Sequence, residues 1–156
     1  MNESEPTAAG PFRLVPVGNH NRAAVLSLQV KEEQIQMVAT TTKSLHEAKT
    51  NSSLVPRVFV EGNRVVGFAM YQRRNDGTAY IWRVMVGAED QGRGLGRKLM
   101  EMLIAEIRAA GHPSILISHR PQNRVAAHLF ESLGFEHEDV EPDGEVLRRL
   151  RLQGPG

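Results

Sequence analysis

The fold is decided by one stretch, Gln91-Gly92-Arg93-Gly94-Leu95-Gly96-Arg97-Lys98, which joins an apolar strand to a strongly periodic helix. Its three glycines let the backbone turn sharply and let an oxygen-rich ligand approach the main chain. The first turn of the following helix offers unpaired N–H groups and the positive end of the helix dipole. The stretch therefore predicts a phosphate site, and the plainer interpretation is a glycine-rich turn with solvated basic side chains.

Two common nucleotide-binding motifs do not fit this stretch. The dinucleotide fingerprint is G-x-G-x-x-G, whereas the glycines here fall as G-x-G-x-G. No acidic residue ends a second parallel strand about twenty residues later, as that fingerprint requires. A P-loop needs four residues between its first glycine and Gly-Lys-Ser/Thr, which the stretch lacks. Both motifs are excluded.

The hydrophobic pattern on either side predicts a mixed α/β fold with a central sheet covered by helices. Gly62-Asn63 and Asn75-Asp76-Gly77 are expected to form hairpin turns, and Ser44, three residues before Glu47, is expected to cap a helix. The expected strands are 12–17, 56–61, 64–73, 79–86, 114–118, 135–140 and 145–152, and the expected helices are 23–30, 44–49, 94–110 and 125–133.

Length and composition predict a single domain over residues 11–152, with flexible tails at 1–10 and 153–156. The 156 residues include 19 basic and 18 acidic side chains, which gives a net charge of +1 and argues against a dedicated nucleic-acid binder. Without cysteine, a disulfide scaffold, a thiolate zinc site and a cysteine nucleophile are excluded. No apolar run could span a bilayer and the start of the chain is not a signal peptide, so we expect a cytoplasmic protein with no membrane partner.

Two motifs together resemble a known family, the GNAT superfamily of N-acetyltransferases. Gln91-x-x-Gly94-x-Gly96 is similar to its acetyl-CoA signature, Q/R-x-x-G-x-G/A. Asn123-x-x-Ala126-x-x-Leu129-Phe130-Glu131-x-Leu133-Gly134-Phe135 is similar to its second signature. The likeness covers about residues 12–152 and is nearest to the bacterial spermine/spermidine (diamine) acetyltransferases. It implies a mostly antiparallel sheet of about seven strands, with one splayed parallel pair and about four helices.

The resemblance implies that acetyl-CoA is the acyl donor, with no metal. The main chain of the strand before the glycines would receive the pantetheine arm, and the amides of 92–97 would hold the pyrophosphate. The N–H near Val86 would polarise the thioester carbonyl. The residues expected to contact the coenzyme are Val84, Met85, Val86, Gln91, Gly92, Arg93, Gly94, Leu95, Gly96, Arg97, Asn123 and Phe130.

The implied reaction is attack of an amine on a thioester, and the amine must first lose a proton. Glu33 is favoured over Glu32 as the base, although both acids could instead lie on a solvated helix face. Relatives often carry Tyr where this chain has Phe130, which has no proton to give. The thiolate would then leave without an acid, or Tyr71, Tyr80 or His119 would protonate it. The expected catalytic residues are Glu33, Val86 and His119, and the expected substrate residues are Glu32, Glu33, Tyr71, Trp82 and His119.

The expected acceptor is a small-molecule amine, with polyamines as the leading subclass. Arg83, His119 and Arg120 fall in the same expected region and would suit an anionic or zwitterionic amine better. Tyr80 and Trp82 are expected to share a strand face with Val84, as a pocket wall. Two other functions stay open: a non-catalytic acyl-CoA-binding module, and a transferase using another donor such as aminoacyl-tRNA, the one case with a nucleic-acid partner. The resemblance also implies a homodimer.

Overall fold

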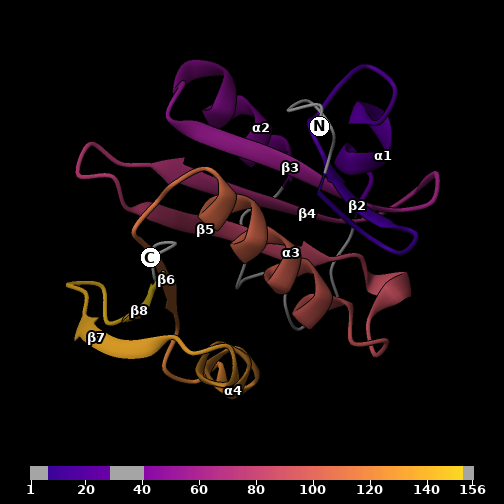
Figure 1. The fold of residues 1–156 in the computed structure, drawn as a ribbon. Coiled ribbons are helices and arrows are strands. Elements are labelled where there is room, and N and C mark those ends of the chain that lie inside the picture. Colours follow the sequence, from indigo (N-terminus) through magenta and orange to yellow (C-terminus); the bar gives the residue numbers. More distant parts are fainter. Residues whose placement is uncertain (1–6, 29–40, 153–156) are drawn as a thin grey trace.

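One mixed sheet organises the chain, and the computed structural model describes residues 7–28 and 41–152 of it. Eight strands lie in the order β1-β2-β3-β4-β5-β6-β8-β7 over the described residues (Figure 1). The strands are β1 (Thr7–Ala9), β2 (Phe12–Val15), β3 (Leu54–Glu61), β4 (Arg64–Arg73), β5 (Ala79–Val86), β6 (Ser114–His119), β7 (Glu136–Val140) and β8 (Val146–Arg151). The helices are α1 (Arg22–Leu26), α2 (Thr41–Thr50), the 3-10 turn η2 (Ala88–Asp90), α3 (Leu95–Ala109) and α4 (Arg124–Ser132).

Neighbouring strands are antiparallel except for β5 and β6, which are parallel. Two parallel neighbours need a crossover connection, and α3 provides it between β5 and β6. The expected α/β fold, a mostly antiparallel sheet with one parallel pair and four helices, is therefore confirmed.

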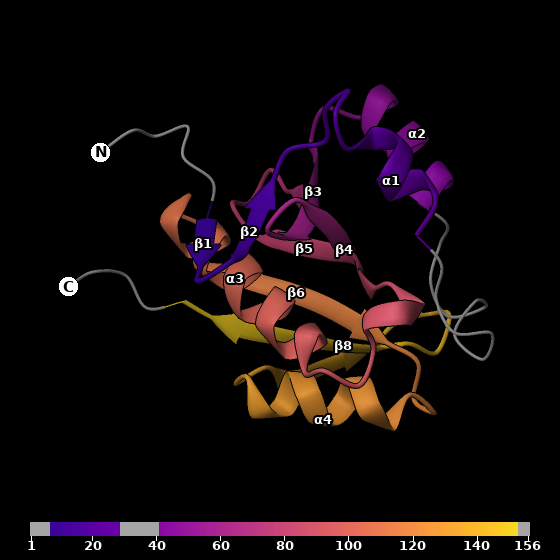
Figure 2. The ribbon, with the colours of Figure 1, turned by 90° about the vertical axis from the view of Figure 1, so that its right-hand side faces the viewer.

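Helices cover both faces of the sheet, and the sheet divides the core into two parts (Figure 2). On one face α3 and α4 pack against β5, β6 and β8, with Leu99, Leu103 and Ile107 of α3 fully buried. On the other face Val25 of α1 and Leu45 of α2 pack against β3 and β4. None of the helices in the described part of the chain is long and apolar enough to cross a membrane.

Two local features differ from the sequence expectation. A short edge strand, β1, lies within the segment expected to be a tail and pairs with β2. Helix α2 starts at Thr41, so the prediction that Ser44 caps it is wrong. Ser44 is 1% exposed inside the helix, and its hydroxyl has no hydrogen-bond partner in the described structure. Packing of Leu45 against the sheet outweighs the local capping preference.

Candidate active site

The parallel pair separates partway along its length. Its last paired residues are Ile81 and Ile117, although β5 continues to Val86 and β6 to His119. Beyond that point a cavity of about 210 Å³ opens between the two strands, α4 and the start of β8. Its lining residues are Ile81, Trp82, Arg83, Val84, Ile117, Ser118, His119, Arg120, Asn123, Ala126, Phe130 and Glu145.

A β-bulge in β5 decides which side chains face which layer. Tyr71 pairs with Ile81 and Met70 with Arg83, so Trp82 is an extra residue without a partner in β4. Trp82 packs with the core under α1 and α2, whereas Val84 packs with the core under α3 and α4. The expectation that Tyr80, Trp82 and Val84 share one face is therefore wrong, because the bulge interrupts the two-residue alternation of the strand.

The main chain at the end of β5 faces the opened side of the sheet, away from β4. The N–H of Gly87 donates to the Val66 carbonyl at 2.9 Å, so Gly87 faces β4 and Val86 faces away from it. Gln91 Nε2 donates to the Val86 carbonyl at 3.0 Å, which fixes the following loop to the strand. The N–H of Val86 points to the same edge as that carbonyl, and Val84, two residues earlier, shares this orientation.

The glycine loop leads into α3 without a side-chain cap. Gly94, the residue that precedes the helix, has φ 74° and Gly92 has φ 83°, a left-handed conformation that favours glycine. A Cβ atom at Gly92, Gly94 or Gly96 would meet nothing within 4 Å, so the space beside this backbone is open. The first amides of a helix lack partners within it, so this open helix start fits a phosphate group.

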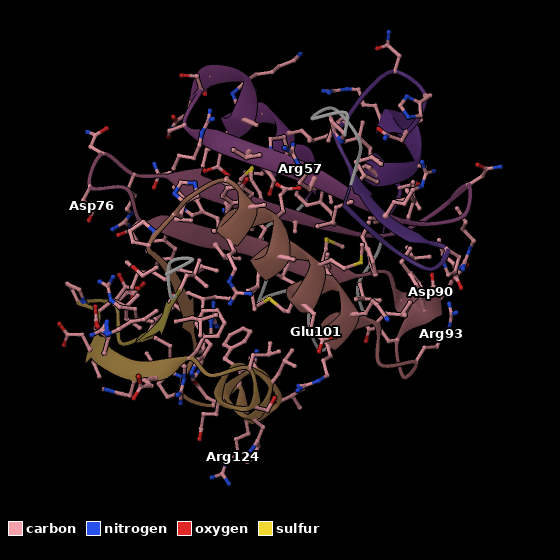
Figure 3. All side chains as sticks on the ribbon, viewed as in Figure 1. Arg57, Asp76, Asp90, Arg93, Glu101 and Arg124 are labelled. Carbon is pink, nitrogen blue, oxygen red and sulfur yellow. The ribbon has the colours of Figure 1, made fainter. Side chains whose placement is uncertain are left out.

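A buried carboxylate holds the loop in place. Asp90 is 4% exposed and accepts hydrogen bonds from Arg64 at 2.7 and 2.8 Å and from Arg93 at 3.0 Å. Asp90 and Arg93 lie beside each other where η2 leads into the loop (Figure 3). Arg93 also binds both carboxylate oxygens of Glu61, at 2.9 and 3.0 Å, and this hydrogen bonding lowers the pKa of Glu61 below its ordinary value. The guanidinium of Arg93 is thus engaged by carboxylates, which leaves its main chain as the part suited to a phosphate.

Three further residues of the expected coenzyme set take structural positions around α3 and α4. Arg97 donates to Ser132 Oγ at 2.6 Å and so connects the two helices. Asn123 caps α4 by accepting from the Ala126 N–H at 3.1 Å, and it lines the cavity. Phe130 is 7% exposed, lines the same cavity and packs against the ring of His119 at 5.9 Å.

His119 is held by both of its ring nitrogens. Nε2 accepts from Arg148 Nε at 2.9 Å, and Nδ1 lies 2.8 Å from the Arg120 carbonyl. A carbonyl can only accept, so Nδ1 carries the proton and the imidazole is neutral in this arrangement. His119 is 7% exposed and lines the cavity, where these two hydrogen bonds hold its ring in place.

Two carboxylates of the β7–β8 turn lie near the opening, and sequence reasoning missed them as site residues. Ser118 Oγ donates to Glu145 Oε1 at 2.9 Å, and Tyr80 Oη donates to Glu141 Oε1 at 2.9 Å. Of these two acids only Glu145 lines the cavity. Burial raises the pKa of Tyr80. The hydrogen bond with Ser118 lowers this pKa, and Glu141 raises it further, so the net shift is upward. In the sequence, Asp143-Gly144-Glu145-Val146 resembles the spermine/spermidine acetyltransferases, but that likeness gave Glu145 no role in the site.

The remaining expected residues are dispersed. Tyr71 is 3% exposed on the α3 side, where its hydroxyl donates to Glu106 at 2.9 Å, and it does not line the cavity. Burial, with the charge of Glu106, raises the pKa of Tyr71. Met85 is buried in the core under α1 and α2. Glu32 and Glu33 lie outside the described residues. Within the described ranges, no three His, Asp or Glu side chains gather in a way that could hold a metal ion.

Known proteins are similar to this chain in sequence and in fold. The acetyltransferase (GNAT) family model matches residues 21–135. The spermine/spermidine N(1)-acetyltransferase of Bacillus subtilis (strain 168) is 30% identical over 129 residues, which is 77% of this chain and 84% of that protein. The L-amino acid N-acyltransferase MnaT of Escherichia coli (strain K12) is 37% identical over 93 residues, 57% of this chain and 54% of that one.

A solved structure extends the comparison. The aminoglycoside acetyltransferase AAC(6')-Ib, solved in complex with coenzyme A, has the same fold, with a TM-score of 0.75 and 18% identity over 90% of this chain and 94% of that one. The expected acetyl-CoA donor is thereby confirmed at the level of the family. With the split parallel pair, the open glycine loop and the matched family model in agreement, the chain belongs to the GNAT family of acetyltransferases.

Proposed function

We propose that the protein transfers an acetyl group from acetyl-CoA to a primary amine of a small molecule, by direct attack within a ternary complex. One observation carries the proposal: the main chain of β5 beyond Ile81 has separated from β6, and Gln91 connects it to the loop that leads into the uncapped start of α3. The pantetheine arm that carries the thioester and the pyrophosphate attached to it, two adjoining parts of one coenzyme, suit these two neighbouring features.

Each part of the opened edge has a role in this proposal. Amides of residues 92–97 would bind the pyrophosphate, and the Asp90–Arg93 contact would hold that loop still. The edge of Val84 and Val86 would pair with the amides of the pantetheine arm. The Val86 N–H would stabilise the negative charge that develops on the thioester oxygen. Phe130 and Asn123 would form the opposite wall.

The proton transfers follow from the reacting groups. An alkylamine has a pKa near 10.4, so its ammonium form must give up a proton to a base before attack. Glu33, the base expected from the sequence, lies outside the described residues. A thiol has a pKa near 8.5, so the coenzyme can leave as a thiolate without an acid. For His119 to act as that acid, Nδ1 would have to break its contact with the Arg120 carbonyl, so we assign His119 to the wall.

The acceptor class is supported by relatives and by the cavity lining. The Bacillus subtilis relative, an enzyme for spermine and spermidine, supports a polyamine. The cavity is lined by Arg83 and Arg120 as well as by Glu145, which would also suit a zwitterionic amine. Homodimerisation and a cytoplasmic location stay predictions.

An amine panel tests the proposal. Coenzyme A binding would be measured by calorimetry, and thiol release from acetyl-CoA would be followed with spermidine, a diaminoalkane, a monoamine and an α-amino acid. Thiol release above hydrolysis with any of these amines is the expected result. Coenzyme binding without release would favour a non-catalytic acyl-CoA-binding module. Salt-sensitive tRNA binding without coenzyme affinity would favour an aminoacyl-tRNA donor.

A further inference from the structure

The cavity has one carboxylate among its described lining residues, Glu145, and it belongs to the turn between β7 and β8. Ser118 donates to its Oε1 atom at 2.9 Å. Ser118 is the first residue of β6 beyond the last pair with β5, so the carboxylate lies where the two strands begin to separate. A carboxylate at that point faces the space in which β5 and β6 leave their main chains exposed.

The backbone of Glu145 is fixed at both of its polar groups. Its N–H donates to Asp143 Oδ1 at 3.0 Å, and its carbonyl accepts from the Glu141 N–H at 2.8 Å. The next residue, Val146, pairs with His119 across β8 and β6. The turn therefore presents the carboxylate from a rigid frame, at little further entropic cost when a ligand binds.

We infer that Glu145 binds the ammonium group of the acceptor and accepts its proton, an inference that rests on the proposed acetyl transfer. Opposite charges at hydrogen-bond distance bind strongly in a partly enclosed cavity. Ser118 holds one carboxylate oxygen and leaves the second for the ammonium group. The apolar part of the acceptor would lie against Trp82 and Phe130, which also line the cavity.

The step balances in protons and electrons. The ammonium group gives one proton to the Glu145 carboxylate, and the free amine lone pair attacks the thioester carbon. A C–N bond forms, the C–S bond breaks, and the coenzyme leaves as a thiolate. The amide nitrogen loses its second proton to the thiolate or to water, and Glu145 returns its own proton to solvent.

Several charged or titratable groups surround the Glu145 carboxylate, and their charges affect how its protonation depends on pH. They are Tyr80 and Arg83 of β5, His119 of β6, Arg120, Glu141, Asp143, and Arg74, which lies over the Tyr80 ring. Glu141 offers a matched control. It is a carboxylate of the same turn and accepts from a hydroxyl at the same 2.9 Å, but it does not line the cavity.

The test compares Glu145→Gln with Glu141→Gln in the full chain, using spermidine and the most active amine of the panel. Loss of a general base lowers kcat/KM by about 10²–10⁴-fold, so we expect this for Glu145→Gln near neutral pH. The deficit should shrink as the pH rises toward the amine pKa, near 10.4, because the free amine then needs no base. Glu141→Gln should keep the wild-type pH profile, and both variants should bind coenzyme A as the wild type does.

Three outcomes overturn the inference. A wild-type pH profile for Glu145→Gln does so, as does an equal loss at every pH in both variants, which would show a structural role of the turn. A loss confined to Glu33→Gln would return the base to the expected residue. If the wild type binds coenzyme A and releases no thiol with any amine, the proposed function itself fails, a result distinct from these three.

Discussion

Arg148 Nε donates a hydrogen bond to His119 Nε2 at 2.9 Å, which joins β8 to the end of β6 beneath Phe130. The guanidinium is always charged and can only donate, so it holds the imidazole in the tautomer with the proton on Nδ1. We expect ¹⁵N NMR to show this neutral tautomer, and Arg148→Met to remove its preference. Losing a hydrogen bond from a charged donor should also lower the free energy of unfolding by about 1–3 kcal/mol.

The neighbouring arginine provides the control for that experiment. Arg149 pairs with Glu138 and Ser114, so Arg149→Met removes a charge from the same strand without touching the imidazole. An unchanged His119 spectrum in Arg148→Met would contradict the assigned tautomer. A changed spectrum in Arg149→Met would show that the effect is general to β8.

Gly96→Glu should weaken coenzyme binding while the domain stays folded. Gly96 lies in the first turn of α3 with open space beside it, so a side chain fits without strain. A carboxylate about 4 Å from a phosphate costs about 1–4 kcal/mol, or about 5- to 1,000-fold in affinity. Ala105→Glu places the same charge on an exposed position of the same helix and should bind coenzyme A normally. Equal affinity of the two variants in calorimetry would refute the phosphate site.

Asp90→Asn should raise the KM for acetyl-CoA and leave kcat close to the wild-type value. Asp90 connects the glycine loop to Arg64 on β4, and an amide can accept only part of its hydrogen bonds. We expect a loss of about 1–3 kcal/mol in unfolding free energy. Glu89→Gln is the matched control, because the Glu89 side chain is 90% exposed and 3.4 Å from the same arginine. A fall in kcat alone would place Asp90 in the chemistry rather than in loop positioning.

Acid should loosen the contact between the loop and β3. The hydrogen bond from Arg93 lowers the pKa of Glu61, so the unfolded chain takes up the proton at a higher pH than the folded chain does. The stabilisation is thus present above the ordinary glutamate value of 4.5 and is lost as the pH falls below it. Urea midpoints measured between pH 7 and pH 3 should fall, and Glu61→Gln should flatten that slope. An identical slope in the variant would remove Glu61 from the acid response.

Much of the fold could be predicted because its signals are local. The turn residues Gly62 and Asn63 define a hairpin, and the spacing from Leu95 to Ile107 defines a long helix. The two family motifs, at residues 91–96 and 123–135, could be found for the same reason. Asn123, Ala126 and Phe130 of the second motif reach the cavity because the crossover through α3 places β6 beside β5.

Other parts of the site depend on pairing between distant segments. The extra residue in β5, Trp82, arises from its register with β4, which the alternation of the strand itself does not encode. Tyr71, an expected substrate residue, faces α3 instead, where Glu106 accepts a hydrogen bond from its hydroxyl. Glu145 reaches the cavity only because β8 returns beside β6. Sequence patterns carry no information on these long-range meetings.

The bulge in β5 has a consequence for how this protein could diversify. Trp82 and Arg83 turn toward α2, where Arg83 pairs with Glu47 at 3.3 Å, whereas Val84 and Val86 pack on the α3 side. The inserted residue thus places two consecutive side chains on the α2 face of the strand, whereas the coenzyme is proposed to meet Val84 and Val86. Substitutions at Trp82 and Arg83 can alter the choice of amine while the coenzyme contacts stay intact. Deleting Trp82 would leave Ile81 and Arg83 opposite the consecutive β4 residues Tyr71 and Met70, so Val84 and Val86 would keep their face while the amine side loses one side chain.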